Sequence, residues 1–264
     1  TPDAWKDFWM NEDAESYYFV GKDNVPFHAI IWPAMLLAYG DLNLPTNVPA
    51  NQYILIKGEK ASASRGVGKT LNDYLDEWNP DSLRYALASI LPEQNDSEIS
   101  EDEMIRRNNE ELVAAWGNLV QRVFSQYINN YEKLDFDFEL NEIDKKIIDE
   151  ASVCFEKTSE LIEKVELKSS LQSVMGYVNK INAYLNETEP WKIIKEDNAR
   201  ATAILHTSLT AIDACASLFT PFMPTTSEVV KNAIEKNTNN NWSVNDIKKG
   251  APLENIGHLF KKFD

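Results

Sequence analysis

Apolar residues after about residue 100 recur at the three- and four-residue spacing of amphipathic helices. A capping-box pattern, Ser100-Glu101-Asp102-Glu103, is typical of the start of the first helix. Its apolar stripe consists of Leu112, Trp116, Leu119, Val120, Val123 and Tyr127. Further segments alternate apolar stripes with Glu- and Lys-rich faces, near 141–164, 168–187, 197–219 and 224–236. Together these patterns predict a five-helix bundle, followed from Asn237 by a polar tail that packs back on it.

The first 95 residues mix strand and helix patterns. The aromatic and β-branched run 17–20 predicts a short strand, and Pro26 followed by the apolar stretch 28–37 predicts a buried helix. A second strand is predicted over 53–56, and residues 81–91 have helical spacing. We therefore predict an α+β to mostly α fold with two parts, residues 1–95 and 96–264.

Composition narrows the class of protein. Hydrophobic residues make up 43% of the chain and charged residues 26%, which excludes disordered and collagen-like proteins. The net charge of −16 argues against a surface that coats nucleic acid or anionic membrane as a whole. No stretch has the length and apolarity that a membrane span requires, so we expect no membrane partner and a cytoplasmic location. The two distant cysteines, Cys154 and Cys215, predict buried thiols and neither a disulfide nor a metal site.

The turn Gly21-Lys22-Asp23 lies at the carboxyl end of a predicted strand, where open α/β sheets bind ligands. Backbone N–H groups and the helix dipole favour phosphate there, and an acidic residue such as Asp23 can bind ribose hydroxyls. A solvated turn is the simpler alternative. His28, one turn into the following helix, is equally consistent with an interior histidine.

The loop from Gly58 to Gly66 follows the second predicted strand and combines cations, hydroxyls and small residues. Lys60 and Arg65 can neutralise phosphoryl oxygens, while Ser62 and Ser64 can donate hydrogen bonds to them. The loop therefore suits a triphosphate, although a solvated basic loop has the same composition.

An alternative overlaps this loop. Residues 63–70, Ala-Ser-Arg-Gly-Val-Gly-Lys-Thr, fit a relaxed phosphate-binding loop in which Lys69 would be the phosphate ligand. A true P-loop follows its strand without a break, whereas a polar stretch intervenes here, and the first glycine is replaced by Ala63. A P-loop nucleotide-binding protein is therefore the weaker hypothesis.

Several separated motifs, in order, resemble the downstream half of a methionyl-tRNA synthetase, a class I aminoacyl-tRNA synthetase. The similarity covers nearly the whole chain. The motifs are 21–28 (GKDNVPFH), 31–36 (IWPAML), 60–66 (KASASRG), 81–85 (DSLRY), 107–112 (RNNEEL), 117–122 (GNLVQR), 189–191 (EPW) and 220–224 (TPFMP).

The resemblance implies roles in ATP-dependent attachment of methionine to its tRNA, with ATP bound as its magnesium complex. Asp23 would hold the ATP ribose with Gly21 close by, and Phe27 and His28 would border the methionine pocket. Residues 60–64 would form the mobile KMSKS-type loop that clamps the triphosphate, in a Rossmann-like catalytic remnant.

In the helical anticodon-binding domain, the resemblance implies that Asn118 and Arg122 read anticodon bases and that Trp191 stacks on one. Asn118 and Arg122 are four residues apart and so share a helix face. Without the resemblance, Trp191 would be assigned to the core and the other two to a solvated face. A helical protein-interaction module without RNA contact is thus a further alternative.

Two departures from the family pattern matter. Ala61 and Ala63 stand where the family's loop carries a methionine and a second lysine. The upstream half of the catalytic domain, with its HIGH signature and zinc-binding cysteines, is not in this sequence. We therefore expect that the isolated chain does not catalyse and that the missing half is a partner.

Overall fold

The computed structural model describes residues 2–56, 58–60, 68–131, 138–234, 242–245, 247 and 253–264. The chain divides into two compact units. Unit 1 comprises residues 1–68 and 90–100, and unit 2 comprises residues 69–89 and 101–264. The boundary predicted near residue 95 stays a prediction, while the helices of residues 69–89 belong to the helical unit.

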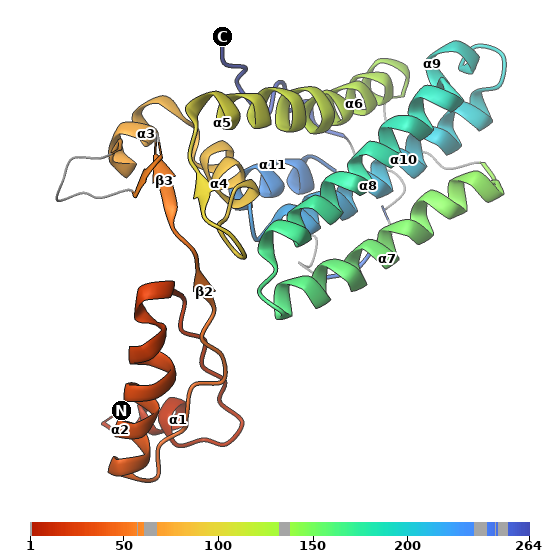
Figure 1. The fold of residues 1–264 in the computed structure, drawn as a ribbon. Helices are drawn as coiled ribbons and strands as arrows, with labels where there is room; N and C mark the ends of the chain where they lie inside the picture. The colour runs from red at the N-terminus through yellow and green to blue at the C-terminus, as the bar shows by residue number, and fades with distance from the viewer. Residues whose placement is uncertain are drawn as a thin grey trace. The chain divides into compact units, whose positions relative to one another are not determined.

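Unit 1 contains short strands and helices. They are α1 (Lys6–Trp9), β1 (Val20–Gly21), the 3-10 turn η1 (Lys22–Asn24), the π-helical η2 (Phe27–Ile31), α2 (Trp32–Tyr39), β2 (Ala50–Asn51), β3 (Ile54–Ile56), β4 (Glu59–Lys60) and β5 (Ser97–Glu98) (Figure 1). β1 pairs in parallel with β2, and β3 pairs with β4 antiparallel and with β5 in parallel. α2 ends at Gly40, whose φ of 88° places it in the left-handed region that glycine tolerates.

The helix predicted over 28–37 is present as η2 and α2, but the prediction that it is buried is wrong. Among its residues only Leu36 is buried. Its exposed apolar side chains are Phe27, Ile30, Ile31, Met35, Leu37 and Tyr39. The spacing correctly indicated apolar faces, but the described part of unit 1 supplies nothing that covers them.

Unit 2 is helical. Its elements are α3 (Leu71–Glu77), α4 (Pro80–Ser89), α5 (Glu101–Arg107), the π-helical η4 (Asn108–Gly117), α6 (Asn118–Asn130), α7 (Glu142–Glu163), α8 (Leu167–Thr188), α9 (Pro190–Ile193), α10 (Asn198–Phe219) and α11 (Pro224–Ile234) (Figure 1). All five segments predicted to be helical are helical over the residues that the structure describes, which for the last segment end at Ile234, and the stripe from Leu112 to Tyr127 is buried as expected.

α10 is the central helix of unit 2 and packs against α6, α7, α8, α9 and α11. By length and composition it is the one helix of the described chain that could cross a membrane, although the sequence pattern did not single it out. In this fold 94% of its apolar window is buried against neighbouring helices. Cys154 and Cys215 are free and buried in the same core, as predicted.

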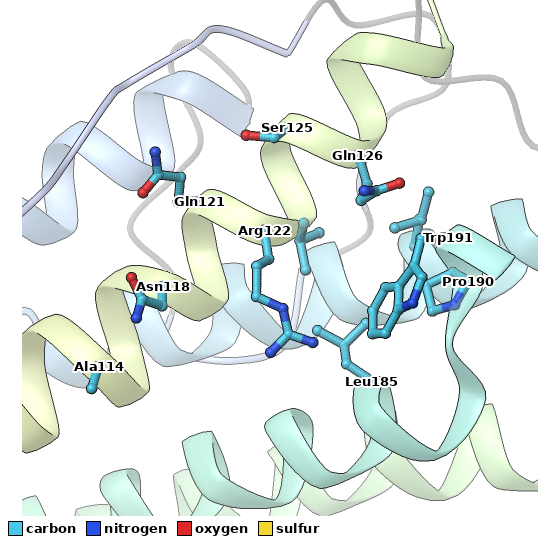
Figure 2. A pocket seen from close by; sticks show the side chains of 11 residues that line it. Ala114, Asn118, Gln121, Arg122, Ser125, Gln126, Leu185, Pro190 and Trp191 are labelled. Carbon is cyan, nitrogen blue, oxygen red and sulfur yellow. The ribbon is translucent and has the colours of Figure 1, made fainter.

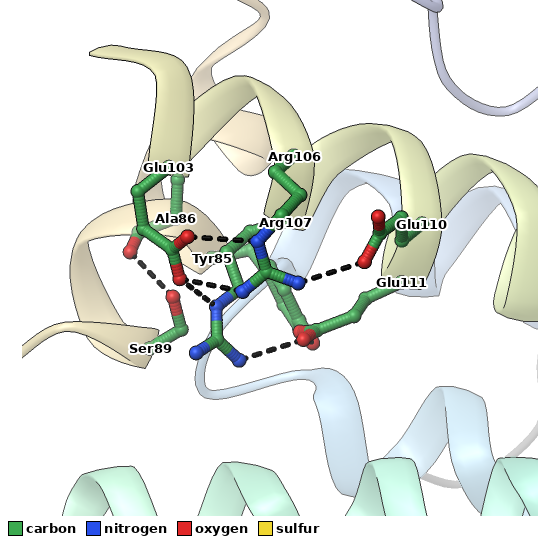
Figure 3. A network of polar contacts seen from close by, with 8 residues as sticks. All are labelled: Tyr85, Ala86, Ser89, Glu103, Arg106, Arg107, Glu110 and Glu111. Carbon is green, nitrogen blue, oxygen red and sulfur yellow. Dashed lines mark hydrogen bonds and ion pairs between the residues drawn. The ribbon is translucent and has the colours of Figure 1, made fainter. Parts of the chain in front are cut away.

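A network of charged side chains links α4, α5 and η4 (Figure 3). Glu103 accepts hydrogen bonds from Arg106 and Arg107, and these contacts lower its pKa to about 2. Arg107 also forms an ion pair with Glu111 at 2.7 Å. Glu111 in turn accepts a hydrogen bond from the Tyr85 hydroxyl at 2.5 Å. Burial, followed by the nearby Glu111 charge, raises the pKa of Tyr85 well above its usual range. Tyr85 is thus held as a neutral donor between helices.

The motif 81–85 anchors α4 to the turn between α10 and α11. Asp81 is only 2% exposed and accepts a hydrogen bond at 2.5 Å from the backbone N–H of Thr226, which lies in the first turn of α11. Arg84 donates to the carbonyls of Pro221 and Phe222 at 2.8 and 2.9 Å. These contacts stabilise the fold of unit 2, which explains this motif without a catalytic role.

The C-terminal residues pack back on unit 2, as predicted. Asn108 donates to the Lys261 carbonyl at 2.9 Å, and Asn109 exchanges two hydrogen bonds with the backbone of Phe263. The Phe263 ring lies 4.3 Å from the Trp78 ring, centroid to centroid. The two asparagines therefore fasten the end of the chain to η4.

Candidate functional site

The first candidate site lies in unit 1, where Asp23 and Lys60 meet. Asp23 lies in the η1 turn directly after β1, and Lys60 ends β4. The Lys60 Nζ donates to Asp23 Oδ2 at 2.8 Å, and the Tyr53 hydroxyl donates to Asp23 Oδ1. The structure therefore brings together the two residues that the sequence assigned to ribose and to phosphate. They form an ion pair with each other.

Tyr53 is the centre of this cluster, although no pattern in the sequence marks it as a site residue. The ammonium groups of Lys22 and Lys60 each lie 3.8 Å from its ring centroid. Its backbone N–H donates to Asp96 at 2.9 Å, and Asp96 pairs with Lys22 at 2.7 Å. In the sequence Tyr53 resembles an ordinary strand residue, because its partners Lys22, Asp23 and Asp96 lie 30 or more residues away. Only its place seven residues before Lys60 in a strand–turn–strand pattern could have indicated the contact.

These contacts shift the two titrating groups in opposite directions. The hydrogen bond from Lys60, followed by that from Tyr53, lowers the pKa of Asp23 below its usual range. The same pair raises the pKa of Lys60, chiefly through its hydrogen bond to Asp23. Because the folded pKa of Asp23 is lowered, the pair is intact at neutral pH and is lost as the pH falls through that value.

We expect Lys60→Ala to raise the pKa of Asp23 toward its ordinary value, since it removes the strongest cause of the shift. Tyr53→Phe should raise this pKa by a smaller amount, and Lys22→Ala by the least. NMR titration of the Asp23 carboxyl carbon measures all three. A larger shift from Tyr53→Phe than from Lys60→Ala would contradict this geometry.

The other predicted residues of unit 1 lie around this turn. An added Cβ at Gly21 would meet no atom within 4 Å, so the backbone there is open to a ligand. Phe27 is exposed, while His28 is half-buried with its Nδ1 3.1 Å from the Asn24 carbonyl and its ring beside Tyr18. Their assignment to a methionine pocket stays a prediction.

Ser62, Ser64 and Arg65 lie outside the described residues, as do Ala61 and Ala63. After this segment in the sequence, Lys69 pairs with Glu101 at 2.8 Å and with Glu77 at 3.3 Å. The lysine that a P-loop would use is thus paired with two carboxylates, as Lys60 is with one, so these ion pairs do not by themselves decide between the two phosphate-binding alternatives. In the described part of the chain, no group of three or more His, Cys, Asp or Glu residues is placed to hold a metal.

The second candidate site is a pocket of about 590 Å³ in unit 2 (Figure 2). Asn118 and Arg122, on successive turns of α6, line it together with Trp191 of α9. The Arg122 guanidinium carbon lies 5.2 Å from the centroid of the Trp191 ring, and Arg122 donates to Asn186 at 3.0 Å. The structure therefore brings together all three residues that the sequence assigned to base recognition.

A break between α8 and α10 positions Trp191. Glu189 adopts a left-handed backbone with φ of 43°, which ends α8, and Pro190 begins the short α9. Trp191 follows and remains 36% exposed, although most large aromatic residues of this unit are buried. Apolar side chains also line the pocket, namely Val123, Leu185, Pro190 and Leu205. An exposed indole, a planar guanidinium and an apolar lining are what recognition of an unpaired base requires.

Family models match both parts of the chain. The model described as tRNA synthetases class I (M) matches residues 1–124, and the anticodon binding domain of methionyl tRNA ligase matches residues 137–264. The chain belongs to the methionyl-tRNA synthetase family. The first region ends within α6, after Asn118 and Arg122, and Trp191 lies in the second region.

Relatives and solved structures agree with this assignment. The chain is similar to a methionine–tRNA ligase of Chloroflexus aggregans, at 39% identity over 86% of the chain and 40% of that protein. It is 38% identical to that of Corynebacterium glutamicum, over 97% of the chain and 45% of that protein. The fold resembles Mycobacterium tuberculosis methionyl-tRNA synthetase in complex with methionyl-adenylate, with a TM-score of 0.86 at 24% identity, over 94% of this chain and 50% of that one. The chain thus spans about half or less of the proteins it matches.

Proposed function

We propose that this chain supplies the anticodon-binding domain and the downstream part of the catalytic domain of a methionine–tRNA ligase. The observation that carries the proposal is the pocket in which Asn118, Arg122 and Trp191 converge, in a chain whose second part matches the family's anticodon-binding domain. The reaction is ATP-dependent attachment of methionine to its tRNA. Methionine, ATP with magnesium, and the methionine-accepting tRNA are the substrates, and we expect the protein to act in the cytoplasm.

In the proposed reaction, the methionine carboxylate attacks the α-phosphate of ATP and pyrophosphate leaves. A terminal ribose hydroxyl of the tRNA then attacks the adenylate. Positioning and charge stabilisation are the main contributions of the protein to such steps. Phe27 and His28 would border the methionine, and Gly21 would lie near the nucleotide.

Asp23 and Lys60 have complementary roles in this proposal. The Lys60 ammonium would neutralise phosphoryl oxygens and Asp23 would accept the ribose hydroxyls, with Ser62, Ser64 and Arg65 completing the phosphate contacts. In the structure Lys60 is paired with Asp23. ATP binding then requires this exposed pair to separate, which is inexpensive because surface ion pairs contribute little.

Unit 1 also carries a feature that supports a further protein partner. The apolar side chains of η2 and α2 are mostly exposed, including Ile30, Met35 and Tyr39. Soluble proteins rarely leave such a group of apolar residues uncovered. We propose that the missing upstream half of the catalytic domain covers it.

The function is tested by binding of an anticodon stem-loop to the chain as it stands. We expect tighter binding to the stem-loop of the methionine-accepting tRNA than to stem-loops with altered anticodons. We also expect no methionine-dependent ATP–pyrophosphate exchange by this chain alone, because half of the proposed catalytic site is missing. Fluorescence anisotropy at low salt measures the binding.

The control is a stem-loop of the same stem sequence with an unrelated loop. Absence of RNA binding at low salt would favour the alternative of a protein-interaction module. Pyrophosphate exchange by the chain alone would contradict the division of the active site.

A further inference from the structure

Gln126 extends the line of polar side chains along α6. It follows Arg122 by four residues and Asn118 by eight, so the three lie on successive turns of one face. It lines the same pocket. In Figure 2 its side chain lies on the side of α6 toward Trp191, whereas Gln121 and Ser125 point away from the indole.

The Gln126 amide is uncommitted among the described residues. The structure gives this half-buried side chain no hydrogen bond there, and only the backbone carbonyl of Gln126 accepts one, from Asn130 at 2.7 Å. Arg122, by contrast, already donates to Asn186 and lies beside the Trp191 ring. A polar group that lines a pocket without a protein partner is available to a ligand.

We propose that Gln126 is a specificity-determining residue that contacts the edge of an unpaired base in this pocket. The inference rests on the proposed function and extends it beyond Asn118, Arg122 and Trp191. A primary amide both donates and accepts, so it can form paired hydrogen bonds with a base edge that carries an adjacent acceptor and donor.

The length of the row supports contacts with more than one base. Eight residues of α-helix rise by about 12 Å, whereas stacked bases are about 3.4 Å apart. Asn118 and Gln126, at the two ends, therefore face different nucleotides of a bound loop. Arg122 lies between them on the helix, and its guanidinium and the neighbouring Trp191 ring supply the stacking surface.

The test uses the present chain and Gln126→Met, which keeps the side-chain length and removes the amide. We expect affinity for the matched anticodon stem-loop to fall about 2- to 12-fold, the value of one neutral hydrogen bond. Stem-loops with each anticodon base changed in turn should show reduced discrimination at one position only. Asn129→Ala, an exposed residue of the same helix outside the pocket, is the control.

The outcomes separate this inference from the proposed function. If Trp191→Ala weakens binding while Gln126→Met does not, the role of Gln126 is overturned and the anticodon site stands. A loss that is equal for every anticodon would also overturn it, since it indicates packing and not base contact. If neither variant affects binding, the proposed function itself fails.

Discussion

Trp191→Ala is expected to weaken binding of the methionine-accepting anticodon stem-loop by about 5- to 150-fold, the loss that corresponds to one stacked base. The melting temperature should change little, because the indole is 36% exposed and lies at a pocket, not in the core. Truncation of a core tryptophan would instead cost about 3–5 kcal/mol of stability. Anisotropy titration and thermal denaturation on the same variant distinguish the two roles.

Trp242 offers a matched control. It is 40% exposed, packs edge-on against Phe155 and does not line the pocket. Trp242→Ala should leave RNA affinity unchanged, whereas Arg122→Ala should reduce discrimination between matched and altered anticodons. Unfolding of unit 2 by Trp191→Ala would show that the base-stacking role is wrong.

The second large effect is a loss of stability, expected when Asp144 is replaced, because its carboxylate connects three helices of unit 2. The carboxylate is fully buried near the start of α7, where it also completes a capping box with Asn141. It accepts two hydrogen bonds from Arg200 of α10 and one, at 2.5 Å, from the hydroxyl of Tyr184 on α8. The Asn141 N–H is a fourth donor, at 3.0 Å, so the carboxylate accepts hydrogen bonds from α8, from α10 and from the N-cap of its own helix.

Asp144→Ala should destabilise unit 2 by about 3–5 kcal/mol, because it leaves the partly buried Arg200 guanidinium without its counter-charge. For a unit of this size the melting temperature should fall by between about 6 and 20 °C. Urea denaturation followed by circular dichroism measures the change. Lys145→Ala is the control, since it removes only an exposed ion pair with Glu142.

Asp144 should make the stability of unit 2 fall as the pH is lowered. Burial raises the pKa of Asp144, but the hydrogen bonds from Arg200, Tyr184 and Asn141 outweigh burial and lower it. A carboxyl with a lowered folded pKa stabilises the protein above its unfolded pKa, and this contribution is lost as the pH falls through the folded value. The stability of Asp144→Ala should thus depend less on pH in the acid range. Equal acid sensitivity of both proteins would contradict this assignment.

The parts that sequence patterns predicted well are those with sustained helical periodicity. α7 and α10 begin and end within two residues of their predicted bounds, because their apolar stripes are long and their ends carry caps or prolines. Asn118, Arg122 and Trp191 were assigned to one site through the family resemblance and do share a pocket. Their roles in base recognition stay predictions.

Contacts between distant segments could not be predicted in the same way. Nothing local marks Tyr53 as the partner of two lysines, or Asp144 as the partner of Arg200, 56 residues away. The exposure of η2 and α2 was missed for a related reason. Periodicity shows that a face is apolar, but whether it is covered depends on chain that packs against it.

The π-helical segment η4 lies between two sets of polar side chains on one continuous helix, those that bind the C-terminal residues and those that line the pocket. Asn108 and Asn109, at its start, bind the C-terminal residues, while Asn118, directly after it, opens the face that lines the pocket. Loss of one residue here, with the winding of the helix otherwise unchanged, would rotate everything downstream by roughly a quarter of a turn, since each residue of a helix turns the chain by about 100°. The pocket side chains would then turn away from Trp191 while the C-terminal contacts stayed in place. Length, and not only composition, is therefore under constraint between residues 108 and 117.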